Sequence, residues 1–118
     1  MNVIFIEIGM GVDLHGQDAT LAAIKACKNA IGHNSMPGIR QVLPDHDIHN
    51  MKVRVKLGVP VPAEQVDVER VKAVFPYGQV SIDIVPGGLI CSSGIVLPDK
   101  GDVNDEAYIV NAAVEVGY

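Results

Sequence analysis

Alternation between apolar and polar residues predicts most of the secondary structure of this chain. Residues 51–59 alternate cleanly, so their apolar side chains share one face of a strand and their basic side chains share the other. The basic residues are Lys52, Arg54 and Lys56. Shorter runs of the same kind predict strands at residues 3–8, 80–84, 89–96 and 108–116. In the first of these strands, the residues expected on one face are Ile4, Ile6 and Ile8, and those on the other are Val3, Phe5 and Glu7.

Apolar residues at intervals of three and four predict two helices. Asp18 can cap the first helix at its N-terminus, and Gly32 suits the position just after its last residue. The expected inward stripe of this helix consists of Leu21, Ile24, Cys27 and Ile31. A second helix is predicted over residues 63–75, whereas residues 33–50 are irregular and have room for one or two helical turns at residues 39–43.

The order of the predicted elements is β-α-β-α-β-β-β, which defines a single α+β domain over residues 1–118. We expect one mostly antiparallel or mixed sheet of about five strands, with two helices packed on one face. Two helices cannot cover both faces, so the second face is either solvated or buried against another subunit. The polar residues expected there are Glu7, Lys52, Arg54, Lys56, Ser81, Asp83, Asn111 and Glu115. A subunit interface is the favoured interpretation, because this mixture of charges is joined by Val3, Phe5 and Ala113.

Composition narrows the class of protein further. Apolar residues make up 48% of the chain, which favours a folded globular domain over a disordered one. A net charge of −5 and the absence of tryptophan argue against a nucleic-acid-binding surface. No apolar run approaches the roughly 18–20 residues of a membrane span. We therefore expect a cytoplasmic protein without membrane partners, in which Cys27 and Cys91 are reduced thiols rather than a disulfide.

The richest candidate chemistry lies between the first strand and the first helix, in residues 9–18. Asp13 and His15 are two residues apart on an extended segment, so their side chains can converge on one ligand and act as a catalytic pair. Around them, the residues expected to bind the ligand are Gly9, Gly11, Gly16 and Gln17. The alternative is that Asp13 and His15 only satisfy backbone groups of a tight turn. A dinucleotide fingerprint is disfavoured, because Leu14 stands where its third glycine is needed.

Two further groups of residues are weaker candidates. Lys52, Arg54 and Lys56 could bind a carboxylate or phosphate, or could pair with Asp83 and Glu115 on neighbouring strands. His46 and His49, with acids beside them, have the composition of a zinc or nickel site, but loop residues in contact with solvent are the favoured interpretation. We therefore expect no metal ligands, and the sequence leaves any cofactor unidentified.

The residues of the turn also carry a resemblance. Gly9, Gly11, Asp13, His15 and Gly16 form the motif Gly-x-Gly-x-Asp-x-His-Gly, which resembles a group of small conserved hypothetical proteins. Residues 56–60, 71–78 and 110–118 look similar too, and the family implies no assigned reaction. The predicted order of elements bears a looser likeness to trimeric folds of the YjgF and Bacillus-type chorismate mutase kind. That likeness implies sheets that meet at a trimer centre and ligands bound in clefts between subunits.

Three functional hypotheses follow. The first is an oligomeric enzyme or ligand-binding protein, with a trimer favoured, that acts on a small polar or anionic metabolite at the motif. The second is a non-enzymatic module in which the motif organises the fold and the open sheet face assembles a homo-oligomer. The third, a minor one, is a metal-dependent hydrolase that uses Asp13 and His15 with His46 or His49.

Overall fold

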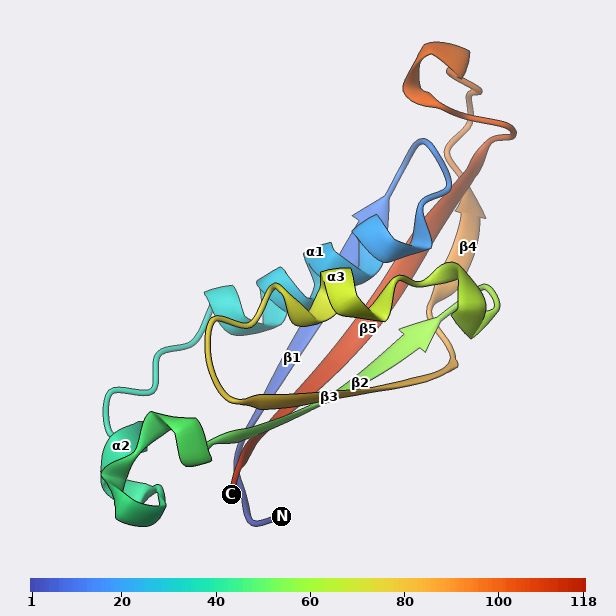
Figure 1. Ribbon diagram of the computed structural model, residues 1–118. Helices are drawn as coiled ribbons and strands as arrows, with labels where there is room; N and C mark the ends of the chain where they lie inside the picture. The colour runs from blue at the N-terminus through green and yellow to red at the C-terminus, as the bar shows by residue number, and fades with distance from the viewer.

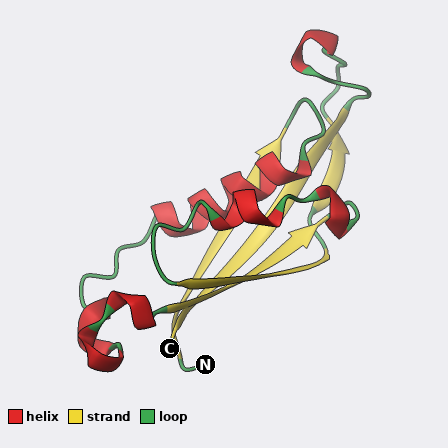
Figure 2. Ribbon diagram, viewed as in Figure 1, coloured by secondary structure: helices red, strands yellow, loops and turns green.

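A mixed sheet of five strands carries two helices on one face, with a third short helix beyond one end, as the computed structural model of all 118 residues shows (Figure 1, Figure 2). The strands are β1 (Val3–Asp13), β2 (Lys52–Val59), β3 (Gln79–Pro86), β4 (Leu89–Ser92) and β5 (Glu106–Gly117). The helices are α1 (Ala19–Gly32), α2 (Ile39–Val42) and α3 (Val68–Lys72). This confirms the predicted α+β class with a single sheet. No helix combines the length and the apolar character needed to cross a membrane.

The longest strand, β5, lies inside the sheet, whose order is β1-β5-β2-β3. It is antiparallel to β1 and β2, while β2 and β3 run parallel and are joined through α3. The short strand β4 pairs with residues 106–109 of β5, beyond the segment that pairs with β2. The molecule is consequently elongated, with extents of 52, 24 and 19 Å, and the two ends of β5 lie far apart.

Helix α1 packs on β1 through alanines rather than through the larger residues that its periodicity indicated. Its buried residues are Ala19, Thr20, Ala22, Ala23, Ala26, Cys27 and Ala30. Of the predicted stripe only Cys27 is fully buried; Leu21, Ile24 and Ile31 are partly exposed. The cause lies in β1, where a Cβ atom added to Gly9 would meet Ala26 O at 2.3 Å and one added to Gly11 would meet Ala22 O at 2.1 Å. With no side chains between them, the helix and strand approach so closely that only small residues fit.

The close approach of α1 also reverses the predicted faces of β1. Glu7 lies on the same face of β1 as Gly9 and Gly11, so its side chain points toward α1 and is buried. Ile6, Ile8 and Met10 point to the open face instead, with 63%, 69% and 54% of their surface exposed. The assignment of Glu7 to the open face was therefore wrong, because glycine packing against a helix outweighs the preference of isoleucine for the core.

Several boundaries differ from the predicted ones: β1 continues past Ile8 through Gly9 and Gly11 to Asp13. The second helix is broken into a 3-10 turn at Ala63–Gln65 and α3, and the residues between Gly32 and β2 contain α2 and two 3-10 turns. Strand β4 ends at Ser92, earlier than predicted, so that residues 93–105 form an arm beyond the sheet. One cluster of 20 buried residues forms the core between the helices and the sheet.

Candidate functional site

The turn between β1 and α1 meets the arm (residues 93–105) at one end of the elongated molecule (Figure 1). Asp13 ends β1, and Asp18 begins α1 by accepting a hydrogen bond from Leu21 N–H at 3.0 Å, which confirms the predicted cap. The central contact joins His15 Nδ1 to Asp102 Oδ2 at 2.6 Å. These two residues are 87 positions apart in the chain, so only the fold brings them together.

The carboxylate of Asp102 accepts hydrogen bonds from three further groups besides His15. Its Oδ2 also accepts a hydrogen bond from Leu97 N–H at 2.9 Å, and its Oδ1 accepts from Gly16 N–H at 2.7 Å and Gln17 Nε2 at 3.0 Å. Burial alone would raise the pKa of the Asp102 carboxyl, but the donors of Leu97, Gly16, His15 and Gln17 outweigh it and hold that pKa well below its usual range. Asp102 is therefore an ionised carboxylate at neutral pH.

Gln17 fastens the arm to the turn with both ends of its amide. Besides Asp102, its Nε2 donates to the carbonyl of Glu106 at 2.8 Å, and its Oε1 accepts from Val103 N–H at 3.0 Å. Gln17 also adopts a left-handed backbone conformation, with a φ of 50°. We call these hydrogen bonds and those of Asp102 the clasp. Because the amide of Gln17 is engaged in the clasp, its predicted role in ligand binding stays a prediction.

Asp13 is the last residue of β1 and does not hydrogen-bond to His15. Its carboxylate is buried and Oδ2 accepts from Asp18 N–H at 2.8 Å, so it shapes the start of the helix. The carboxylate partner of His15 is Asp102, which sequence reasoning missed. Asp102 stands in an acidic loop without a motif around it, and no local pattern indicated that this loop folds back onto the turn. The catalytic role of Asp13 stays a prediction.

The motif glycines fall into two kinds. Gly16 has a φ of +99°, which side chains rarely tolerate, and it contributes its N–H to the clasp. Gly9 and Gly11 instead face α1, whose backbone occupies the space that their side chains would need. Close packing accounts for these two glycines without a ligand, and their predicted part in ligand binding is untested.

The imidazole of His15 is the chemically available group of the site. Because Asp102 is a carboxylate, Nδ1 carries the proton of that hydrogen bond, and the neutral ring then presents Nε2 as an acceptor. Nε2 forms no hydrogen bond within the protein, and the side chain is 20% exposed. Such an oriented histidine can accept a proton or bind a hydrogen-bond donor. It lines none of the hollows of the single subunit; the largest, about 650 Å³, is bounded by residues 59–63 and 84–90 and contains no ionisable side chain.

The basic residues of β2 lie far from His15. Arg54 donates from Nη2 to Glu115 Oε2 at 2.8 Å and from Nε to Oε1 at 3.2 Å, and Lys56 lies 4.0 Å from Asp83. The cross-strand pairs that the sequence allowed are therefore present. Arg54 lies level with Ile6 across β5, and the seven residues from there to the end of β1 span about 23 Å. Lys52 is two residues farther, and Lys56, level with Ile8, is still about 17 Å from the end of β1, so none of the three can share a small ligand with His15 of the same subunit.

The loop histidines are occupied by local contacts. His49 Nδ1 lies 2.8 Å from Asp47 Oδ1, and His46 Nδ1 lies 3.1 Å from the carbonyl of Arg40. Nowhere does the structure gather three or more histidine, cysteine or acidic side chains in a geometry for a metal ion.

Together these features define a small α+β protein in which a His–Asp pair and a glutamine clasp a projecting arm to a glycine-rich turn. The chain belongs to the Lin0512 family of conserved hypothetical proteins, whose model matches residues 3–116. It is similar to the crystal structure of an FtsZ-like protein of unknown function from Nostoc punctiforme PCC 73102, with 43% identity and a TM-score of 0.86. That match covers 98% of this chain and 93% of the other. No match was found among curated proteins. The likeness to YjgF and chorismate mutase trimers stays a prediction.

Proposed function

We propose that this protein is a homo-oligomer that binds a small polar or anionic metabolite beside His15, at the boundary between subunits. The observation that carries the proposal is the His15–Asp102 pair, 2.6 Å apart, which follows directly after the edge strand β1 with its exposed apolar side chains. Asp102 orients the ring, and Nε2 serves as the acid–base or ligand-binding group.

The open sheet face has the chemistry of an interface between copies of this chain. Ile6, Ile8 and Met10 form an exposed apolar row along the edge strand β1, and Leu14 continues their alternation toward His15 with 56% of its surface exposed. Covering each of these side chains contributes about 1–2 kcal/mol to association. The same face offers both charge signs, on β2 and β5. A second copy can therefore match it in apolar surface and in charge, and a trimer is the expected state.

An interface also explains why His15 lines no hollow of the single subunit. In the proposed assembly, the neighbouring subunit provides the other wall of the ligand site. The basic residues of β2 lie at least about 17 Å along the sheet from the end of β1, after which His15 follows. Only a neighbouring copy can bring Lys52, Arg54 or Lys56 to an anionic ligand held by His15.

The interface is tested by native mass spectrometry and light scattering on the wild type and two matched variants. Ile8→Asp places a charge in the centre of the apolar row and is expected to give monomers. Val42→Asp adds the same charge at an apolar residue of α2 that is also exposed (49%, against 69% for Ile8) and lies away from the sheet, and it is expected to leave the oligomer intact. A monomeric wild type at micromolar concentration contradicts the proposed interface.

The ligand site is tested by NMR titration with inorganic phosphate and with short dicarboxylates. We expect saturable shifts in residues 14–17 that are lost in His15→Asn and retained in Gln17→Ala, which weakens the same clasp without removing the imidazole. Equal loss in both variants, or no saturable shifts in the wild type, contradicts a ligand-binding role for His15.

A non-enzymatic module is the second candidate, and the completeness of the clasp favours it. Four donors satisfy Asp102, and Gln17 binds two residues of the arm and the first residue of β5, so the motif has a sufficient structural role without any ligand. In that case His15→Asn and Gln17→Ala lower the free energy of unfolding by similar amounts, and neither changes any binding property.

A further inference from the structure

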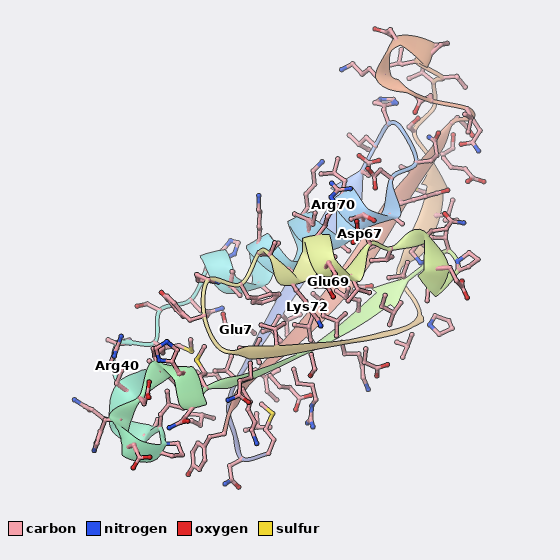
Figure 3. All side chains as sticks on the ribbon, viewed as in Figure 1. Glu7, Arg40, Asp67, Glu69, Arg70 and Lys72 are labelled. Carbon is pink, nitrogen blue, oxygen red and sulfur yellow. The ribbon has the colours of Figure 1, made fainter.

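A buried carboxylate faces a small apolar cavity at the opposite end of α1 from His15. Glu7 of β1 lies between α1 and the sheet (Figure 3), with only 5% of its surface exposed. The cavity has a volume of about 180 Å³ and is lined by apolar side chains of α1, β2, β5 and the segment after α3. Tyr77 is the one other lining residue with a polar side chain. Since α1 is about 21 Å long, this cavity is separate from the His15 site.

The fold explains why the cavity exists at Glu7. Along the same face of β1, Gly11 is covered by Ala22 and Gly9 by Ala26 and Ala30. Glu7 comes next, where α1 is ending and no longer closes over the sheet. The room left there is filled neither by a large side chain nor by a second helix, because α3 has only five residues.

The carboxylate of Glu7 has no ionic partner. It forms no ion pair with any lysine, arginine or histidine of the chain. Burial raises the pKa of Glu7, and a side-chain hydrogen bond from Asn34, whose amide also donates to the carbonyl of Ala30 at 2.9 Å, offsets this only in part. Burying an acid without a cation is unfavourable, and a methionine or leucine would fill the same position more stably. An acid that has a hydrogen bond from one amide but no cationic partner, beside an apolar cavity, is instead the arrangement of a ligand site.

We propose that this cavity binds a small apolar amine, with the ligand's ammonium group paired to Glu7 and its hydrocarbon part among the apolar lining. A cavity of about 150 Å³ is enough for benzene, so about 180 Å³ accepts one ring with a short substituent. The ammonium group supplies the charge that Glu7 lacks, in a charge-assisted hydrogen bond. A neutral ligand leaves the acid unpaired, and an anionic ligand adds repulsion. Met36 and Tyr77 line both this cavity and the adjacent surface groove, which places them at its mouth.

The test uses benzylamine, benzyl alcohol and benzoate, which share a ring and differ in charge, in calorimetric and NMR titrations of the whole protein. We expect benzylamine to bind saturably, at least tenfold more tightly than benzyl alcohol, and benzoate not to bind. Glu7→Gln keeps the size of the side chain and is expected to weaken benzylamine at least tenfold while sparing benzyl alcohol. His15→Asn is expected to leave all three affinities unchanged, so this proposal and the function proposed above can fail independently.

Proton release provides a readout in the wild type, which does not depend on the folding of a variant. Pairing with an ammonium requires Glu7 to be ionised, so below the raised pKa of Glu7 benzylamine binding releases a proton. Calorimetry in buffers of different ionisation enthalpy measures that proton. Glu7 and Tyr77 are the ionisable side chains of the lining, and Glu7→Gln is expected to abolish the release. Benzylamine that fails to saturate at millimolar concentration, or that binds no better than benzyl alcohol, overturns the proposal.

Discussion

Replacing Gly11 by alanine tests whether the motif glycines serve packing. The added Cβ would lie 2.1 Å from Ala22 O and 2.3 Å from Ala26 N, both backbone atoms of α1 that no side-chain rotation can move. Ordinary contact begins at 3.4 Å, so the helix must retreat by about 1.3 Å, the difference between 3.4 and 2.1 Å. A gap of 0.5–1 Å already forfeits about a quarter to a half of the dispersion energy across a contact.

The expected cost is at the upper end of the range for overpacking, about 3 kcal/mol. For a chain of this length that corresponds to a fall of about 10 °C in Tm. The measurement is urea unfolding followed by circular dichroism, at one fixed protein concentration because the proposed association would also contribute to stability.

Gly32→Ala is the matched control. No atom lies within 4 Å of a Cβ at Gly32, and its φ is not positive, so alanine there is expected to be neutral or to stabilise the helix by up to about 1 kcal/mol. If Gly11→Ala unfolds within about 0.5 kcal/mol of the wild type, the packing role assigned to the motif glycines is incorrect.

Three further predictions concern the clasp, the thiols and the helix cap. Because folding lowers the pKa of Asp102, the ionised carboxyl stabilises the fold above its unfolded pKa near 3.8, and this stabilisation is lost as the pH falls below that value. Asp102→Asn should therefore be less stable than the wild type at pH 7. In acid-unfolding curves the difference in unfolding free energy between the two proteins should narrow toward about pH 2. Burial raises the pKa of the Cys27 thiol to about 12, whereas Cys91 is exposed. Ellman's reagent should therefore modify Cys91 rapidly in the native protein and Cys27 only in denaturant. Rapid modification of both thiols in the native protein contradicts this. Asp18→Ala removes the cap of α1 and should cost about 1 kcal/mol in urea unfolding, and an unchanged midpoint would show that the cap is dispensable.

The candidate site shows where local reasoning stops. The glycines predict a turn over residues 9–18, but β1 continues through Gly9 and Gly11 to Asp13, so only residues 14–18 connect the strand to the helix. The partner of His15 was not found, because Asp13 is near in sequence whereas Asp102 reaches the turn only through the arm after β4. Glu7 was placed on the wrong face for the same reason: alternation determines which residues share a face, but not which face a second element covers.

By itself, the sequence determined the elements, the α+β class, the family and the cap at Asp18, since each depends on periodicity or on contacts within a few residues. The tertiary structure alone decided the parallel pairing of β2 with β3, the reversal of β1, and the pairing of His15 with Asp102. It also decided that an acid of β1 lies beside an apolar cavity. These features arise from contacts between segments distant in the chain, where the close approach of α1 to two glycines outweighs the local preference of larger apolar residues for the interior.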